Sequence, residues 1–478
     1  MLIFIMHMLI QFINRVEELK FLESLYKEEG CIFIPIYGRR RVGKTELIKV
    51  FIKDKPHVYF LADSGNEAEQ LKRISYITGQ FFNDVSLLSG LYFRNWNDLF
   101  TYLGNKEFKK KFVLVIDEFP YLVYSNKGIS SIFQLALDEV LKHKNIFLIL
   151  CGSSIGMMEK EVLFYKAPLY GRRSGQLKLE PLKFGNINGF LPKYDIKNEI
   201  IAYSILGGIP AYLTKFSDDI DIFVNISEKF FDKNSVLYSE AEILLKEELR
   251  EPNLYFSILK ALSFGKNKLS EIANEIDEPR TSLPRYLLTL ENLGFIKKAV
   301  SIDEKHLHKS RKGIYKISDN YLSFWFRFIY PNKSYIEEGK TEFVLQNVKK
   351  YLPSYVSFVF EDICKEFIKQ TTNFVKVGSW WHKDNEIDIV AIDEDKKEIL
   401  FVECQWKEET MQIDIVKNLK EKSELVNWNN KNRKERFALF SKSGFSKKCL
   451  DYCKENNIKT FDLKGMKKYL MNGSFKWK

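Results

Sequence analysis

An eight-residue stretch, GRRRVGKT (residues 38–45), constrains the fold of this chain more than any other feature of its sequence. Its spacing, G-x-x-x-x-G-K-T, is the Walker A pattern of phosphate-binding loops. The apolar run CIFIPIY precedes it, and the run ELIKVFIK, which is typical of a helix, follows it. Glycines in such a loop let backbone N–H groups surround phosphate oxygens, and the N-terminus of the next helix points at the same anion. The stretch therefore predicts a strand, a nucleotide-binding loop and a helix, in that order.

The pattern also predicts contacts with ATP and Mg²⁺ at individual positions. Lys44 is expected to reach the β- and γ-phosphates, and the hydroxyl of Thr45 is expected to hold Mg²⁺. The residues expected to bind the nucleotide are the whole loop and a serine on a later strand: Gly38, Arg39, Arg40, Arg41, Val42, Gly43, Lys44, Thr45 and Ser153.

A second apolar run, FVLVID (112–117), is followed directly by a second acid, so that Asp117 and Glu118 are adjacent. Such a run is typical of a buried parallel strand, and ligands of parallel sheets bind at the carboxyl ends of the strands. Asp117 is expected to bind Mg²⁺ through its water shell, and Glu118 to polarise the water that attacks the γ-phosphate. Because apolar strands often end in an acid, this assignment depends on the phosphate-binding loop earlier in the chain.

Two later segments have residues suited to a γ-phosphate. The run NIFLILCGSS (145–154) predicts another buried strand, from whose end Ser153 or Ser154 could contact the phosphate. A plain turn between a strand and a helix explains the same residues equally well. Arg172 and Arg173 lie where an arginine could reach a γ-phosphate in its own subunit or in a neighbouring one. A pair of surface arginines is an equal alternative.

Together these segments resemble the archaeal P-loop ATPase family, which belongs to the ASCE class (additional strand, catalytic glutamate) and is related to the AAA+ and STAND NTPases. The resemblance covers about residues 12–240 and rests on FINRVEEL, GRRRVGKTELI, VLVIDEFPYL, LILCGSS, PLYGRRSG and LGGIPAYL. It implies a small helical lid after the ATPase core. It also implies that Glu118 is the catalytic acid and that Arg172 and Arg173 are sensor arginines. Together with Lys44 of the Walker A pattern, these are the candidate catalytic residues.

The middle of the chain has the pattern of a winged helix-turn-helix. Three short helices are expected over 253–265, 269–276 and 282–294, and two strands over 295–302 and 311–318. Three helices followed by a hairpin make up this motif.

The third helix of this motif is the expected DNA-binding element, through Arg280, Thr281, Ser282 and Arg285. Residues 297–316 contain seven Lys or Arg and two acids, a basic wing suited to phosphates. The alternative is a winged helix that contacts only protein. DNA and protein partners therefore both stay open.

The last part of the chain has acids in the order of a PD-(D/E)xK nuclease, whose carboxylates bind Mg²⁺. Glu361 lies on an expected helix (358–368), and two adjacent strands over 375–393 and 398–407 carry Asp388 and Glu403. This part also resembles an uncharacterised domain that follows archaeal ATPases and is counted as similar to the nuclease fold.

One position departs from the nuclease pattern. Gln405 stands where the family has a lysine, and an amide cannot carry a positive charge. Lys407 is on the same face of the expected strand, and its long side chain is the candidate to replace the missing lysine. The complete candidate nuclease site is therefore Glu361, Asp388, Glu403, Gln405 and Lys407.

The length of 478 residues is too great for one core, and the composition is that of a soluble globular protein. The net charge of +11 permits an anionic partner such as DNA. Six scattered cysteines without a CxxC pair predict reduced thiols in the cytoplasm. The apolar residues 1–10 are too few to span a membrane as a helix, so no membrane partner is expected. Oligomers are compatible with the sequence.

The expected fold is α/β, with a P-loop parallel sheet and helical lid, a winged helix, and a C-terminal domain similar to restriction endonucleases. The expected domains are an ATPase core, a helical lid, a winged helix and a nuclease-like domain, at residues 1–180, 181–245, 246–330 and 331–478. The expected function is ATP binding and hydrolysis at DNA. The alternative is a STAND-like switch with protein partners and an inactive nuclease domain.

Overall fold

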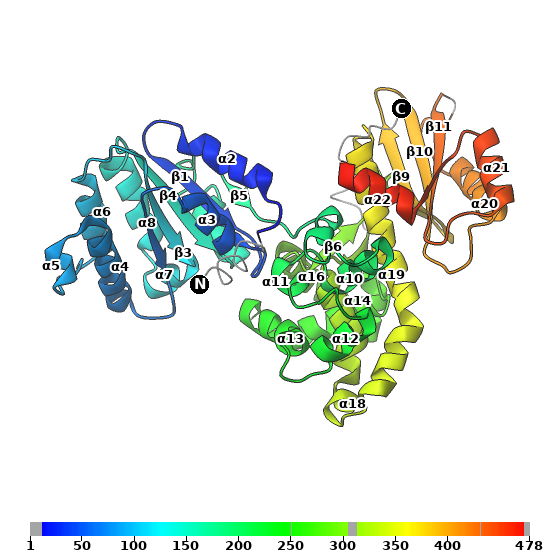
Figure 1. Cartoon of the computed structure of the whole chain (residues 1–478), viewed down its shortest axis with the longest axis horizontal. Helices are drawn as coiled ribbons and strands as arrows, with labels where there is room; N and C mark the ends of the chain where they lie inside the picture. The colour runs from blue at the N-terminus through cyan, green and yellow to red at the C-terminus, as the bar shows by residue number, and fades with distance from the viewer. Residues whose placement is uncertain (1–11, 250, 305–312, 431, 473–478) are drawn as a thin grey trace. The chain divides into compact units, whose positions relative to one another are not determined.

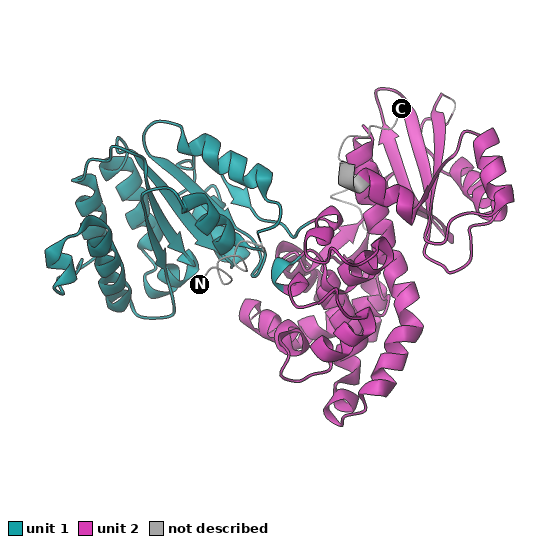
Figure 2. Cartoon of the chain, in the orientation of Figure 1, with its two compact units in different colours: residues 1–182, 209–211 teal, residues 183–208, 212–478 magenta. Residues whose placement is uncertain are grey.

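The computed structural model describes residues 12–249, 251–304, 313–430 and 432–472. The apolar residues 1–10 and much of the expected wing lie outside this part. The chain divides into two compact units, residues 1–182 with 209–211 and residues 183–208 with 212–478 (Figure 2). Boundaries at 180, 245 and 330 stay a prediction. The described residues include no helix that is both long and apolar enough to cross a membrane.

The first unit is built on a five-stranded sheet in the order β2-β3-β4-β1-β5, in which every neighbouring pair is parallel (Figure 1). The strands are β1 (Ile32–Tyr37), β2 (His57–Leu61), β3 (Phe112–Asp117), β4 (Ile146–Gly152) and β5 (Leu177–Lys178). Strands β1, β3 and β4 are buried along their whole length, as expected of central strands in a parallel sheet. The predicted strand, loop and helix around the Walker A pattern are confirmed.

Helices lie on either side of this sheet (Figure 1). Their bounds are α2 (Val16–Tyr26), α3 (Lys44–Ile52), α4 (Glu67–Phe82), α5 (Val85–Leu88), α6 (Trp96–Gly104), α7 (Phe119–Ser125), α8 (Ile129–Leu135) and α9 (Ile155–Met158). Helix α8 continues directly into a π-helical segment, Ala136–Val140. Buried aromatic rings join α6, α7 and α8, with Phe133 packed against Phe100 and Phe119 in edge-to-face pairs.

The second unit begins with helices and contains the predicted winged helix-turn-helix. The helices before it are α10 (Ile196–Leu206), α11 (Pro210–Leu213), which spans the boundary between the units, α12 (Ile222–Phe230) and α13 (Val236–Glu248). The motif itself consists of α14 (Pro252–Ser263), α15 (Leu269–Glu275), α16 (Leu283–Asn292), β6 (Ile296–Ala299) and β7 (Ile314–Ile317). The two strands pair antiparallel, which confirms the predicted hairpin.

A short aromatic helix ties the helical elements of this unit together. Helix α17 (Asn320–Phe324) continues into a π-helical segment, Trp325–Ile329, whose Trp325 indole N–H donates to the carbonyl of Tyr238 at 2.8 Å. The hydroxyl of Tyr321 donates to the carbonyl of Leu237 at 2.9 Å. These bonds satisfy the polar atoms of two fully buried aromatic side chains.

The C-terminal part is a five-stranded mixed sheet in the order β12-β11-β10-β9-β8. Its strands are β8 (Lys376–His382), β9 (Asn385–Asp393), β10 (Glu398–Gln405), β11 (Lys434–Ser441) and β12 (Lys459–Asp462). The helices around it are α19 (Thr341–Thr371), α20 (Ile413–Glu424), α21 (Lys447–Glu455) and α22 (Leu463–Asn472), and the short helix α18 (Lys333–Glu337) precedes α19. The predicted helix 358–368 lies within the C-terminal half of α19.

The prediction of one strand over 375–393 was wrong. The chain turns at Lys383 and Asp384, and His382 pairs with Asn385 to close a hairpin between β8 and β9. Lys383 has φ +53°, in the left-handed region that tight hairpin turns require. The polar pair at this position was the signal for the turn.

The wing is bonded to the C-terminal sheet. The N–H of Ile302, just after β6, donates to the carbonyl of Ser379 on β8 at 3.0 Å. The indole N–H of Trp380 donates to the Asp303 carboxylate at 2.9 Å. Lys297 on β6 pairs with Asp362 on α19 at 2.8 Å. These contacts make the winged helix and the C-terminal sheet parts of one packed unit.

Candidate functional site

The phosphate-binding loop joins β1 to α3 and depends on its two glycines. Gly38 has φ +148°, and a Cβ at this position would collide with the carbonyl oxygen of Leu179. Gly43 has φ +96° and immediately precedes α3. Both conformations are readily adopted only by glycine. The Walker A spacing thus matches the backbone that the loop adopts.

Lys44 holds its charge inside this loop. Its side chain is buried, and its Nζ donates to the carbonyls of Gly38 at 2.8 Å and Arg39 at 2.9 Å. Buried ammonium groups need such acceptors because they lose their hydration. The charge is therefore held at the loop where phosphates are expected.

Asp117, at the end of β3, connects three elements of the first unit. Its carboxylate accepts hydrogen bonds from the Thr45 hydroxyl at 2.8 Å, the Tyr59 hydroxyl at 2.6 Å and the Glu118 N–H at 2.9 Å. The structure thus brings together the two residues predicted to bind Mg²⁺. A hydroxyl and a carboxylate are hard oxygen ligands, and Mg²⁺ takes one or two of these beside substrate phosphates. The pair fits the ion.

Tyr59, on β2, is a site residue that the sequence did not indicate. Burial and its hydrogen bond to Asp117 raise the pKa of its hydroxyl well above the usual value, so the hydroxyl stays a donor. A tyrosine in an apolar strand is too common to predict this contact.

Glu118 and Ser153 directly follow the neighbouring strands β3 and β4, and their side chains are in contact. The Ser153 hydroxyl donates to the Glu118 carboxylate at 2.9 Å, and the Ser153 N–H approaches the same oxygen at 3.3 Å. Glu118 has φ +55°, a conformation uncommon for a residue with a side chain. Such backbone conformations are concentrated at functional sites. Ser154, the alternative to Ser153, precedes α9 and makes no side-chain capping bond there.

The structure pairs Arg172 and Arg173 with other side chains. The Arg172 guanidinium donates to both carboxylate oxygens of Asp138, at 2.8 and 3.0 Å from its Nε. This hydrogen bond is the main reason why the pKa of Asp138 lies below its usual value. Arg173 contacts the Gln176 side chain and lies over the Tyr170 ring. Their roles as sensor arginines stay a prediction.

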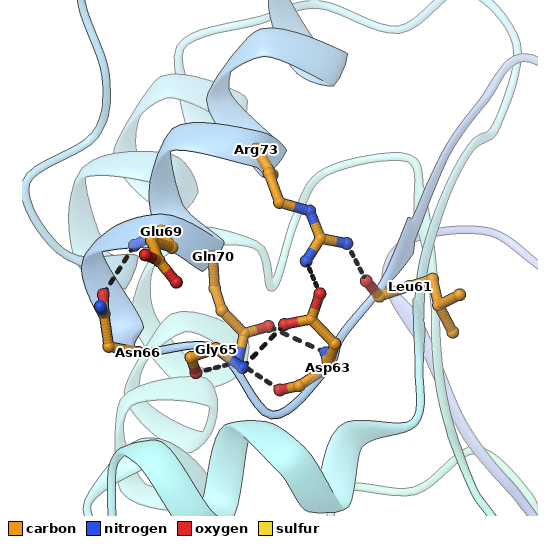
Figure 3. A network of polar contacts seen from close by, with 7 residues as sticks. All are labelled: Leu61, Asp63, Gly65, Asn66, Glu69, Gln70 and Arg73. Atoms are coloured by element: carbon orange, nitrogen blue, oxygen red, sulfur yellow. Dashed lines mark hydrogen bonds and ion pairs between the residues drawn. The ribbon is translucent and has the colours of Figure 1, made fainter.

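A polar pocket lies between the end of β2 and the start of α4 (Figure 3). Arg73 pairs with the Asp63 carboxylate and donates to the carbonyl of Leu61 at 2.6 Å. The Gln70 amide donates to the carbonyls of Asp63 and Gly65, which sets the loop before the helix. The polar side chains at this pocket are thus bonded to one another and to the loop.

The C-terminal part brings the three predicted acids of the nuclease pattern together. Burial, followed by the charge of Asp388, raises the pKa of Glu361 and of Glu403 to about 8. Burial also raises the pKa of Asp388 to about 6, although the Cys404 N–H donates to its carboxylate at 2.7 Å. The exposed Glu386 on β9 adds to these shifts. We call Glu361, Asp388 and Glu403 the carboxylate cluster.

Two side chains at the end of strand β10 have a polar atom without a hydrogen-bond partner among the described residues. Glu403 Oε2 and Gln405 Oε1 are buried without a hydrogen-bond partner in the described part of the chain. Lys407 is exposed and lies beyond the end of β10, and the lysine beside Glu403 is instead Lys422, at 3.9 Å. Within the described ranges, no three His, Cys, Asp or Glu side chains form a ready metal site. The arrangement therefore does not by itself fit a bound Mg²⁺, and the nuclease assignments stay a prediction.

The residues predicted to contact DNA lie just before α16 and in its first turn. Arg280, Thr281 and Arg285 are exposed, and Ser282 is half-buried. The Arg285 guanidinium lies over the ring of its neighbour Tyr286. The predicted contacts are accordingly at the surface.

Comparison with known proteins agrees with this geometry. An ATPase domain found predominantly in Archaea matches residues 12–216. An uncharacterized protein of Methanocaldococcus jannaschii is 37% identical over 424 residues, which cover 87% of this chain and 92% of that protein. The chain belongs to the archaeal P-loop ATPase family. The predicted family is thus confirmed.

Further matches concern single parts of the chain. An IclR helix-turn-helix domain matches residues 255–299, and a family described as archaeal and bacterial proteins of unknown function matches residues 325–435. A short ATP-binding protein of Methanocaldococcus jannaschii, itself uncharacterized, is 52% identical over 50 residues, 10% of this chain and 85% of that protein. The helix-turn-helix match agrees with the predicted winged helix.

Two solved structures are also similar. A Walker-type ATPase of Pyrococcus abyssi has a TM-score of 0.44 at 22% identity, over 66% of this chain and 96% of that one. The ORC2 protein of Aeropyrum pernix has a TM-score of 0.42 at 14% identity, over 70% of this chain and 96% of that one.

The raised pKa values of the carboxylate cluster predict a pH-dependent stability. Between the ordinary value of 4.5 and about 8, folded Glu361 and Glu403 bind more protons than the unfolded chain does. Stability is therefore lost as the pH rises through this range. Glu361→Gln and Glu403→Gln should each raise the melting temperature in EDTA at about pH 9, and by much less at about pH 5. The control is Glu409→Gln, at an exposed acid of the same part. Equal or lower melting temperatures at the higher pH would contradict the burial of these charges.

Proposed function

We propose that this archaeal ATPase hydrolyses ATP with Mg²⁺ and acts at DNA, which it binds through the winged helix. The observation that carries the proposal is the hydrogen bond between Thr45, in the phosphate-binding loop, and Asp117, at the end of β3. It joins a nucleotide loop to an acid at the carboxyl edge of a parallel sheet, where such proteins bind their ligands. The six free thiols suit a reducing compartment such as the cytoplasm.

Each residue of the site has a role in this reaction. Lys44 would exchange its carbonyl partners for the β- and γ-phosphates of ATP. Thr45 and Asp117 would hold Mg²⁺, which when bound neutralises charge on those phosphates. Glu118 would orient and polarise a water molecule, and Ser153 would fix the orientation of the Glu118 carboxylate. The water oxygen bonds to the γ-phosphorus as the bond from that phosphorus to the bridging oxygen of ADP breaks.

The DNA proposal is supported by the exposed start of α16. Arginines on an exposed recognition helix can reach phosphates and base edges in the major groove. The net charge of +11 favours an anionic partner. The C-terminal part is proposed to be nuclease-like, because its carboxylate cluster gathers the acids of that pattern at one place.

A second candidate is a STAND-like switch whose winged helix and C-terminal part bind protein partners, with an inactive nuclease domain. The bonds between the wing segment near Ile302 and strand β8 favour it, because they use part of the wing for protein contact. Gln405 in place of a lysine favours an inactive domain. In this case ATP turnover would not respond to DNA.

Replacing Lys44 tests the nucleotide site. Lys44→Ala should lower steady-state ATP turnover roughly 100-fold or more, because it removes the cation that contacts the developing charge on the phosphates. Lys49→Ala is the matched control, since Lys49 lies on the same helix, is exposed and pairs with exposed Glu46. Thermal melting of both variants would exclude misfolding. Undiminished hydrolysis in a folded Lys44→Ala protein would contradict the assignment.

Replacing the arginines at α16 tests the DNA proposal. Arg280→Ala with Arg285→Ala should weaken binding to duplex DNA. The double substitution should also reduce the slope of the logarithm of the binding constant against the logarithm of the salt concentration, by about one for each phosphate contact that is lost. Lys260→Ala, at an exposed position on α14, is the control. Fluorescence anisotropy over a range of salt concentrations measures both quantities. A wild-type chain without affinity for DNA at low salt would favour the switch with protein partners instead.

A further inference from the structure

The cation in contact with the carboxylate cluster comes from a helix that the nuclease pattern did not include. Helix α20 packs against β9 and β10 with its buried residues Val416, Leu419 and Ser423. Lys422 lies beside this buried face, and its Nζ is 3.9 Å from Glu403 Oε1. Both side chains are only 21% exposed, so water screens this pair less than a surface pair.

Neither Gln405 nor Lys407, the two positions that the sequence suggested for a cation, supplies a positive charge at the carboxylate cluster. Gln405 carries none, and its Oε1 is buried without a partner in the part of the chain that the structure describes. Lys407 is exposed, and its backbone carbonyl accepts a hydrogen bond from the Ser443 hydroxyl at 2.7 Å. The strand that carries Glu403 therefore places no cation at the cluster.

Lys365 is the competing cation, because it lies one helical turn after Glu361 on α19. Its Nζ pairs with Asp362 at 3.4 Å, and Asp362 is also bound by Lys297 from the wing at 2.8 Å. The charge of Lys365 also lowers the pKa of Glu361 and Asp388, but its ion pair is with Asp362, an acid outside the cluster. Lys422 pairs with Glu403 itself, and its charge lowers the pKa of both Glu403 and Asp388.

We propose that Lys422 is the cationic residue of the carboxylate cluster and binds a non-bridging oxygen of a DNA phosphodiester beside Glu403. The inference rests on the proposed function, because it takes DNA as the substrate. It deepens that function by assigning to Lys422 the positive charge that the nuclease pattern expects at position 405. Negative charge on the phosphate oxygens is stabilised by a fixed cation in a site of low water content. Lys422 keeps its proton throughout.

The reaction that this arrangement serves is hydrolysis of the phosphodiester. The oxygen of a water molecule bonds to phosphorus, and the bond between phosphorus and the leaving sugar oxygen breaks. The attacking water gives its proton to solvent, and the leaving oxygen takes a proton from solvent. Lys422 contributes by binding and orienting the phosphate and takes part in no proton transfer.

The test compares the nicking of supercoiled plasmid by full-length variants, both in EDTA and with Mg²⁺ or Mn²⁺ added to the buffer. Lys422→Met should lower the rate of nicking roughly 100-fold, as removal of one charge-stabilising donor does in other enzymes. Lys417→Met, at an exposed position on the same helix, should cut as the wild type does. Adding Gln405→Lys to Lys422→Met should restore cutting, because the charge returns to the same cluster from the neighbouring strand.

A second readout does not depend on cutting. In EDTA, Lys422→Met should reduce the slope of the logarithm of the duplex-binding constant against the logarithm of the salt concentration by about one. Replacing a lysine with a purely structural role would leave this slope unchanged. A wild-type chain that does not cut, a Lys422→Met variant that cuts normally, or a loss of cutting confined to Lys365→Met would each overturn the inference. ATP turnover and DNA binding by the wild-type chain are measured alongside, so a failure of the proposed function appears separately as their absence.

Discussion

The carboxylate of Asp117 is buried at the carboxyl edge of the first unit's sheet, and a buried charge is stable only when polar groups surround it. The Thr45 hydroxyl, the Tyr59 hydroxyl and the Glu118 N–H meet this requirement. They come from the phosphate-binding loop and helix α3, from β2 and from the end of β3, so one anion holds together the elements that make the proposed nucleotide site. The requirement explains why the loop, the acid pair and the neighbouring strand are positioned as a unit.

The acids of the carboxylate cluster differ from Asp117, because within the described ranges they lie beside one another and not beside a full set of hydrogen-bond donors. Glu361, Asp388 and Glu403 repel one another, and burial raises their pKa values above the ordinary range. Lys422 offsets part of this repulsion. Clusters of like charges destabilise a fold, and strongly shifted pKa values are concentrated at functional sites. The contrast suggests that Asp117 serves the fold and the site together, whereas the carboxylate cluster is kept at the expense of stability.

Local sequence patterns predicted the elements of both sites, because strand and helix periodicity and the Walker A spacing depend on neighbours in the chain. The meeting of Thr45 with Asp117 followed from the rule that parallel strands end at one edge. The contacts of Tyr59 and Lys422 were not predictable, because they join residues far apart in sequence whose types are common. The hairpin at Lys383 was missed because its polar turn interrupts the apolar residues of the two strands only briefly, between Trp381 and Ile387. The wing's bonds to β8 likewise arise only from tertiary packing.

At the centre of the proposed mechanism, Glu118 acts on the attacking water and does not serve to bind the nucleotide. The direct measurement is ATP affinity beside single-turnover hydrolysis in Glu118→Gln, which keeps the size of the side chain and an oxygen for the Ser153 hydroxyl. We predict an affinity close to that of the wild type and hydrolysis slower by roughly 100-fold or more. Hydrolysis at the wild-type rate would contradict this role, and so would a decrease in ATP affinity as large as the decrease in hydrolysis.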